Sequence, residues 1–273
     1  FTSCSFAEKN NLLTVEYLNI SKLTSMASMF YNCGSLTYVN TSDWDTSEVT
    51  DMNNMFNNCI LLSQLDVSKF NIGKVSNINS MFRDCRALTS LDVSNWSTGN
   101  VTNMESLFRN CFSLTSLDVS NWDVSQVTTL VSTFRDCSNL TELDVTEWDT
   151  NLVTSMHSTF RDCSSLTTLD ISGWNVDNVS TTDNMMNGCG SLVELDMSNW
   201  NVSNVNNMTN MMYNCYALQT LRVDNWPLNN ITQLAITRLP AGDDTKNIVY
   251  ATVYFTVPSG WELVKPLEIA RYS

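Results

Sequence analysis

Apolar residues along most of the chain recur with a period of 26 residues, and the cysteines show this period most clearly. The repeating cysteines are Cys33, Cys59, Cys85, Cys111, Cys137, Cys163, Cys189 and Cys215. Columns of leucine (Leu36 to Leu218), of tryptophan with one phenylalanine (Trp44 to Trp226) and of valine or isoleucine (Val49 to Ile231) keep the same step without insertions. A period this strict over eight units predicts a solenoid in which each unit contacts its two neighbours.

Each unit contains two patterns of different period. The apolar positions from Val101 to Cys111 lie three or four residues apart, which predicts a helix of about two turns. Thr102, just before those positions, is the predicted N-cap. Residues 114–120 then alternate apolar and polar, which predicts a short strand with one buried face, and residues 121–125 turn the chain toward the next helix.

These elements predict an α/β repeat of the leucine-rich-repeat type. We expect a parallel sheet on the concave face and short helices on the convex face, because helices are wider than strands. No proline precedes Pro227, as a continuous parallel ladder requires.

The two ends depart from the repeat. We expect an N-terminal cap with a degenerate repeat at 1–22, an eight-unit solenoid at 23–232 and a C-terminal cap at 233–273. The β-prone run Ile248–Val257 is predicted to cover the last unit, because an uncovered unit would expose apolar surface and unpaired backbone.

The repeat unit resembles a known family. Its consensus reads V-T-x-M-x-x-(M/L)-F-x-x-C-x-x-L-x-x-L-D-V-S-x-W, which is similar to the 26-residue, BspA-like leucine-rich repeats of bacterial surface proteins. The resemblance covers residues 23 to 232 and implies a secreted or surface-attached protein that takes part in adhesion or host recognition, or a virion fibre protein. It implies no shared chemistry.

Composition narrows the partners. The chain has 273 residues, 43% of them hydrophobic and 15% charged, with a formal net charge of −14. This charge disfavours nucleic acid and anionic membrane surfaces as partners. No apolar run reaches the ~18 residues that a membrane helix needs, so we expect no membrane insertion. Because the chain starts at Phe1, we interpret it as a mature form or a fragment whose export signal is not in view.

The cysteine column has two interpretations. Nine cysteines in a surface protein would ordinarily indicate disulfides. However, Cys4 falls on the same column as the other eight, and side chains of one column point the same way. We therefore favour buried free thiols that act as small hydrophobic residues.

An aspartate column is the main candidate ligand-binding feature. It consists of Asp66, Asp92, Asp118, Asp144, Asp170 and Asp196. Alternation in the strand turns these carboxylates outward, where like charges at strand spacing repel one another. Either a cation such as calcium bridges them, or each accepts hydrogen bonds within the following turn, which is the interpretation that we favour.

Other columns favour structural roles. The tryptophans are predicted to be core residues rather than a sugar-stacking surface. Arg83, Arg109, Arg135 and Arg161 form a basic stripe, which we interpret as a solvated face compensated by neighbouring aspartates, with intermolecular contacts as the alternative.

Nothing in the sequence predicts an enzyme. His157 is the only histidine, and neither a nucleophile elbow, a zinc motif nor a phosphate loop occurs.

The sequence therefore favours an extracellular binding module for a protein or glycan on another cell or surface. Its strand face would carry the aspartates together with a variable row that includes Tyr38, Glu142 and Glu194. The alternative is a structural protein that self-associates into a surface filament or layer.

Overall fold

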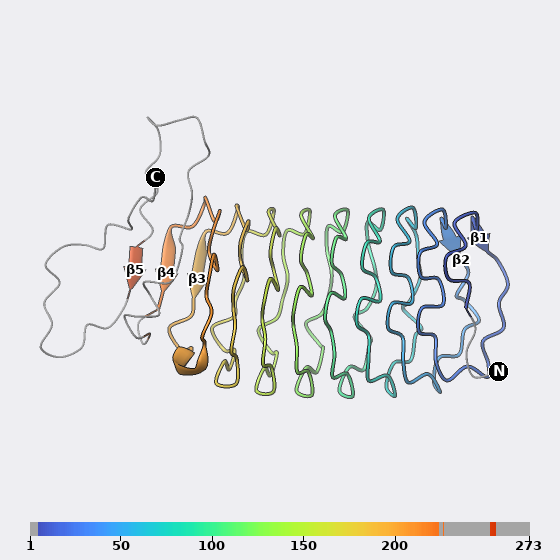
Figure 1. Ribbon diagram of the computed structural model, residues 1–273, viewed down its shortest axis with the longest axis horizontal. Coiled ribbons are helices and arrows are strands. Elements are labelled where there is room, and N and C mark those ends of the chain that lie inside the picture. The colour runs from blue at the N-terminus through green and yellow to red at the C-terminus, as the bar shows by residue number, and fades with distance from the viewer. Residues whose placement is uncertain (1–4, 224–225, 227–251, 255–273) are drawn as a thin grey trace, which may run out of the picture.

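The chain coils once for every 26 residues, and the coils stack in a single row (Figure 1). The computed structural model describes residues 5–223, 226 and 252–254. Cys4 and most of the predicted C-terminal cap lie outside these residues, and the domain boundaries at 22 and 232 stay predictions. The predicted repeat solenoid is confirmed for the described part of the chain.

Regular strands occur at the two ends of the described solenoid. At the N-terminal end, β1 (Thr14–Val15) pairs in parallel with β2 (Tyr38–Val39), and a bridge continues from Tyr38 to Gln64. At the other end, β3 (Glu194–Asp196), β4 (Thr220–Arg222) and β5 (Thr252–Tyr254) form a parallel three-stranded sheet in that order. A strand from the run Ile248–Val257 therefore does pair with the last repeat strand.

The predicted two-turn helices are wrong. The only helix among the described residues is η1, a 3-10 helix at Val202–Asn204. Where the helices were expected, alternate residues donate to the next unit: Ser106 N to Val131 O at 2.8 Å and Phe108 N to Thr133 O at 2.8 Å. The residues between them donate three positions back, as from Leu107 N to Met104 O at 3.2 Å. We call this side of the coil the turn ladder (residues 101–111 in this unit and the equivalent segment of the others).

Left-handed backbone produces this alternation. Ser106 has a φ of 56° and Asn110 a φ of 63°, and the equivalent residues of the other described units have positive φ as well. A chain of such turns also brings every third or fourth residue inward, so its apolar spacing looks helical. Thr102 is not a helix cap; its hydroxyl and its backbone N–H both donate to Ser76 O, at 3.1 and 2.9 Å.

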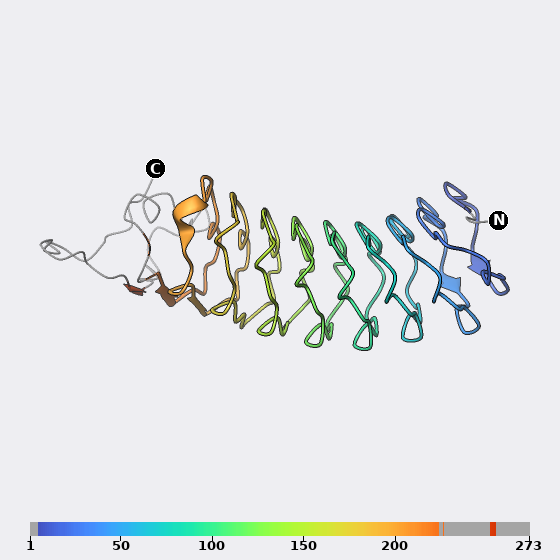
Figure 2. The ribbon, with the colours of Figure 1, turned by 90° about the horizontal axis from the view of Figure 1, so that it is seen from below.

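Without helices, the direction of curvature differs from the prediction. Backbone bridges on the turn ladder run without a break from Ser25 to Asn207. On the strand side, the middle units are joined by long contacts such as Thr167 N to Thr141 O at 3.4 Å. Figure 2 shows a gentle bend with the strands on its outer side. The strand face is therefore convex and the turn ladder lies on the inner side, because the hydrogen-bonded turn ladder is narrower than a row of helices would be.

Aromatic columns fill the space between the two sides. Neighbouring rings of the phenylalanine column, from Phe6 to Phe160, have centroids 5.4–6.0 Å apart. Neighbouring indoles from Trp96 to Trp174 lie 6.0–6.4 Å apart. These distances exceed the ~4.8 Å strand spacing, and the tryptophan column directly follows the strand, so its stacked indoles hold the strand side apart.

Candidate functional site

The strand face carries the predicted candidate residues, all with accessible side chains. The aspartates from Asp66 to Asp170 are exposed, and Asp196 is half-buried. Tyr38, Glu142 and Glu194 are exposed on the adjoining row. Leu117 and Val119, between these positions in one unit, are buried, so the predicted alternation is confirmed.

Each aspartate is held by the residue two positions on. Asp118 Oδ1 accepts from the backbone N–H of Ser120 at 3.1 Å and from its hydroxyl at 2.7 Å. The same pair of bonds occurs at Asp66, Asp92, Asp144 and Asp170, and Asp196 accepts from Ser198 N at 2.9 Å. These bonds are the structural interpretation that the sequence favoured, in which the aspartate closes its own turn.

At Asp66 and Asp144 these bonds also stabilise the ionised carboxyl. The hydroxyl and then the backbone N–H of Ser68 lower the pKa of Asp66, and Thr146 lowers the pKa of Asp144 in the same way. Among the described residues, no group of three or more His, Cys, Asp and Glu side chains is arranged to hold a metal ion. Calcium binding at this row stays a prediction.

The strand face is hollowed near its N-terminal end. A shallow depression of about 470 Å³ is lined by Tyr38, Asn40, Gln64, Asp66 and Ser90, among others. It exposes one aromatic ring, an amide and a carboxylate beside small hydroxyl residues, and this mixture can hydrogen-bond and stack a polar ligand.

The eight repeating cysteines are buried free thiols, as predicted. Each donates to a backbone carbonyl of the preceding unit, as from Cys137 Sγ to Phe108 O at 3.2 Å. Burial raises the pKa of each of these eight thiols, and that of Cys215 to about 12. The thiolate needed for metal binding or nucleophilic attack is therefore disfavoured.

The tryptophans are buried as well, so they form no sugar-stacking surface. In six units the indole N–H donates to a carbonyl of the preceding unit, at 3.0–3.2 Å. One of these bonds runs from Trp148 Nε1 to Val119 O. The predicted core role is confirmed.

The structure brings together one set of residues that the sequence did not. His157 Nδ1 lies 2.7 Å from Asp183 Oδ2 of the next unit, and His157 Nε2 lies 3.2 Å from the hydroxyl of Ser158. These are the contacts of a hydrolase triad, but Ser158 is fully buried (0% exposed), so its hydroxyl is out of reach of a substrate. The sequence offered one signal of this contact, because His157 and Asp183 are 26 residues apart and therefore occupy the same position in neighbouring units.

The arginine stripe lies on the turn ladder, and the predicted compensation holds for three of its four members. Ion pairs join Arg83 to Asp84 at 3.4 Å, Arg135 to Asp136 at 3.2 Å and Arg161 to Asp162 at 3.1 Å. Arg109 is followed by Asn110, and no carboxylate of the described residues lies within ion-pair distance of it. The stripe is therefore not evenly self-compensated.

Solved structures with some likeness are leucine-rich repeat proteins and receptors. The complex of TLR13 with ssRNA13 is 15% identical, with a TM-score of 0.41, over 82% of this chain and 32% of the other. The functional domain of InlJ from Listeria monocytogenes, which includes a cysteine ladder, is 21% identical, with a TM-score of 0.35, over 87% and 53%. A leucine-rich cell surface protein from Faecalibacterium prausnitzii is 15% identical, with a TM-score of 0.30, over 81% and 78%.

The chain thus spans about a third of the length of the TLR13 structure. No curated protein matches the sequence. Within the described residues, no helix is long and apolar enough to cross a membrane.

A family model does match. The model described as "Mycoplasma protein of unknown function, DUF285" covers residues 1–116 and 129–237, which is most of the sequence. The chain belongs to the DUF285 family of repeat proteins.

Proposed function

We propose that the protein is an extracellular binding module that recognises a protein or a glycan on another cell or surface through its strand face. The observation that carries this proposal is the contrast between fixed and varied columns. Buried positions repeat the same residues, whereas the accessible row beside the aspartates contains five residue types in eight units. That row is Tyr38, Gln64, Ser90, Ser116, Glu142, Thr168, Glu194 and Thr220.

A rigid scaffold with variable exposed positions is the arrangement that repeat proteins use for recognition. The buried columns hold the backbone of each unit in register, so the exposed row presents its side chains at fixed spacing with little ordering cost on binding. The shallow depression lined by Tyr38 can seat a sugar ring or a polar side chain.

The test is a binding screen with matched variants. Labelled protein is applied to immobilised glycans, matrix proteins and intact cells, and Tyr38→Ala and Glu142→Lys are compared with the original chain. Lys74→Gln is the control, because Lys74 is exposed in the turn after the strand and paired only with Glu48. Loss of binding in both strand-face variants, with Lys74→Gln unaffected, is the expected result; a ligand that all three variants bind equally well would contradict the proposal.

We also propose that the aspartate row binds calcium. A bound ion would raise the melting temperature in proportion to the logarithm of its concentration. An unchanged melting temperature at millimolar calcium would remove the ion from the proposal and leave the hydrogen-bonded aspartates as structural.

One observation favours self-association as a second function. At the N-terminal end, beside the outer edge of β1, Leu13 is 61% exposed and Tyr17 is 93% exposed. Among the described residues β2 is the one strand that pairs with β1, and a free strand edge with apolar side chains can accept a strand of another molecule. Light scattering after size exclusion separates the two functions: polymers that grow with concentration and are lost in Leu13→Asp support assembly, and a monomer at every concentration supports a binding module.

A further inference from the structure

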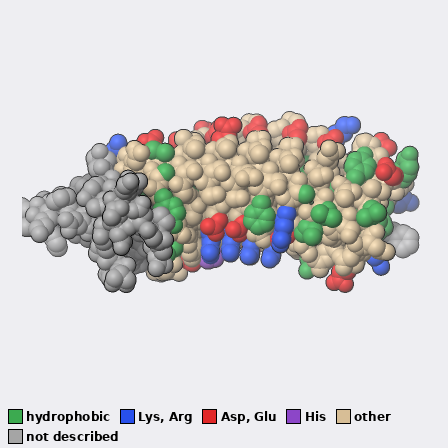
Figure 3. Space-filling model, turned by 90° about the horizontal axis from the view of Figure 1, so that it is seen from above, with side chains coloured by type: hydrophobic (Ala, Val, Ile, Leu, Met, Phe, Trp, Pro, Cys, Tyr) green, Lys and Arg blue, Asp and Glu red, His purple; other side chains and the backbone are tan. Residues whose placement is uncertain are grey.

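The turn ladder carries a second surface, which we call the arginine row (Arg83, Arg109, Arg135 and Arg161). In a chain with only 14 Lys and Arg residues and a net charge of −14, four arginines occupy one column in four successive units. In the two units that flank the row, the same position is occupied by Asn57 and Asn187. In the next units outward it is occupied by Tyr31 and Tyr213. Figure 3 shows the basic side chains in a line, with acidic side chains along one flank.

The row has a regular spacing. Each arginine directly follows a phenylalanine of the stacked column, and the rings of Phe82, Phe108, Phe134 and Phe160 are 5.7–5.8 Å apart. The arginines start from backbone positions on the turn ladder, where hydrogen bonds such as Phe108 N to Thr133 O at 2.8 Å join neighbouring units at about strand spacing. The turn ladder from which these side chains start lies on the inner side of the bend (Figure 2).

Arg109 stands in an unfavourable environment for a cation. Burial lowers the pKa of its guanidinium most, the positive charges of Arg135 and Arg83 lower it further, and the carboxylates of Asp136 and Asp84 offset part of this lowering. The Nε atoms of Arg83 and Arg109 are buried without a hydrogen bond, and only that of Arg83 lies within ion-pair distance of a carboxylate, at 3.4 Å from Asp84 Oδ2. Asn110, which occupies the aspartate position of its unit, donates instead to Asp84 Oδ1 at 2.9 Å. An asparagine at position 109, as in two other units, would avoid these costs, so stability does not explain Arg109.

We propose that the arginine row binds a linear anionic glycan, with one sulfate or carboxylate group held by Arg109 between Arg83 and Arg135. Guanidinium groups form paired, charge-assisted hydrogen bonds with such oxyanions. An anion at Arg109 offsets the repulsion from its two neighbours. The row offers successive subsites to successive sugars of an extended chain.

The flanking carboxylates distinguish a glycan from a nucleic acid. Asp84, Asp136 and Asp162 lie beside the row and can accept hydrogen bonds from sugar hydroxyls. A DNA duplex brings phosphates of two strands, about one charge per 1.7 Å of axis, and would press some of them against these aspartates. The acidic strand face is on the other side of the coil, and charges farther apart than the Debye length of about 8 Å are largely screened.

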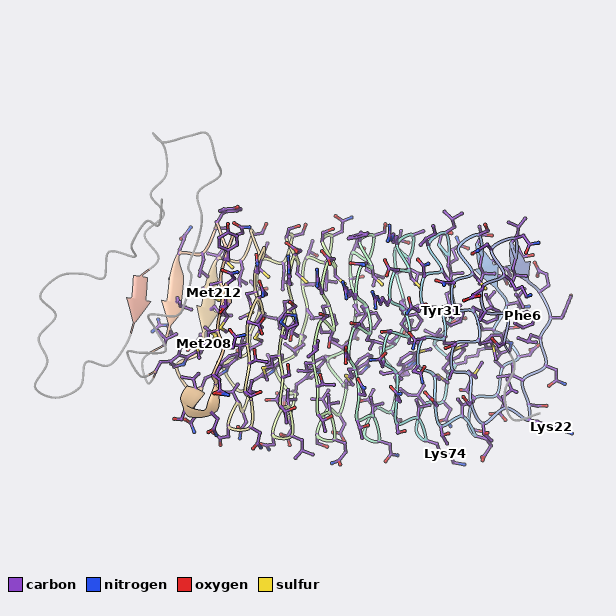
Figure 4. All side chains as sticks on the ribbon, viewed as in Figure 1. Phe6, Lys22, Tyr31, Lys74, Met208 and Met212 are labelled. Atoms are coloured by element: carbon purple, nitrogen blue, oxygen red, sulfur yellow. The ribbon has the colours of Figure 1, made fainter. Side chains whose placement is uncertain are left out.

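The experiment uses the full chain and a size-defined heparin oligosaccharide, with the desulfated oligosaccharide and a short DNA duplex as competing probes. Arg109→Asn introduces the residue type that two other units have in this column, at Asn57 and Asn187. Lys74→Gln makes the same change in charge at an exposed site near the lower edge of the coil in Figure 4, away from the face where Tyr31 is labelled. Affinities are measured by calorimetry at two salt concentrations, and melting temperatures are measured in parallel.

We expect the sulfated oligosaccharide to bind, with an affinity that falls as salt rises. Arg109→Asn should lower the affinity about tenfold or more, and Lys74→Gln should leave it nearly unchanged. The melting temperature of Arg109→Asn should be no lower than that of the original chain, because the variant removes a partly buried charge that has no ion-pair partner among the described residues. Arg109→Lys should recover part of the affinity, since it restores the charge without the planar fork.

Four outcomes would overturn the proposal. They are no binding of the sulfated oligosaccharide, equal binding of its desulfated form, an equal loss of affinity in Lys74→Gln, and tighter binding of the DNA duplex. A melting temperature of Arg109→Asn well below that of the original chain would also overturn it, by assigning Arg109 a structural role.

Discussion

Replacing Trp148 by phenylalanine tests how much a single indole of the stacked column contributes to stability. Trp148 is 2% exposed, stacks between Trp122 and Trp174 at 6.4 and 6.0 Å, and donates to Val119 O at 3.2 Å. Phe70 occupies the same column in another unit, so a phenylalanine fits without changing the path of the chain.

The expected loss has two main parts. Removing the indole N–H costs about 1 kcal/mol rather than the full penalty of an orphaned acceptor, because Val119 O also accepts from Trp122 N at 3.1 Å. Losing the remainder of the second ring removes buried apolar atoms and leaves a small cavity, which costs roughly 1–2 kcal/mol. With weaker stacking on both neighbours included, the free energy of unfolding should fall by about 2–4 kcal/mol.

Urea unfolding followed by circular dichroism measures this difference as a shift of the midpoint at constant slope. Tyr216→Phe is the control, because Tyr216 is 41% exposed and its hydroxyl contacts only Asn214 Oδ1 of its own unit, at 2.7 Å. A loss below about 0.5 kcal/mol in Trp148→Phe would refute the reasoning, since neither the hydrogen bond nor the packing would then contribute.

Three further predictions follow from the turn ladder, the strand face and the thiols. Gly188→Ala should lower the melting temperature, because Gly188 has a φ of +82° and a Cβ there would lie 2.2 Å from Asp162 Oδ1. Gly188→Asn should be tolerated better, since Asn110 and Asn214 adopt this backbone region at the equivalent position, and equal melting curves for both variants would count against this account. Stability should fall as the pH drops below the ordinary aspartate pKa of 3.8, because carboxyls whose pKa is lowered on folding, such as Asp66 and Asp144, favour the folded state only while ionised. Thermal melts between about pH 6 and about pH 2 should show a weaker dependence of the melting temperature on pH in an Asp66→Asn, Asp144→Asn double variant. The eight buried thiols should react with a colorimetric disulfide reagent only as fast as the chain unfolds, and rapid reaction of several thiols per native molecule would contradict the burial described above.

The columns of the repeat could be assigned from the sequence, and most assignments are confirmed. Cys137, Trp148 and Leu117 are buried, and Asp118 is exposed and hydrogen-bonded to Ser120, because a strict period with unvarying residue types indicates one repeated environment. The helices could not be excluded in this way, since a chain of left-handed turns and a short helix place apolar residues at the same spacing. The signal against a helix was the unbroken run of Asn, Asp and Gly in the column of Asn110, because these residues tolerate left-handed backbone better than most.

The candidate surfaces were likewise predictable from the sequence only in part. The strand-face row with Tyr38, Glu142 and Glu194 was predictable because alternation decides which side chains point outward. The contact of His157 with Asp183 and the missing ion pair of Arg109 depend on side-chain packing between units, which a period does not reveal.

The sequence alone determined that this protein is a stack of eight nearly identical units with buried cysteine, phenylalanine and tryptophan columns, because a 26-residue period leaves no other arrangement in which every unit buries its apolar residues. The tertiary structure decided which face is concave. Hydrogen bonds between units close the turn ladder to strand spacing while stacked rings hold the strand side apart, and this difference in width places the arginine row on the inner side and the aspartates on the outer side.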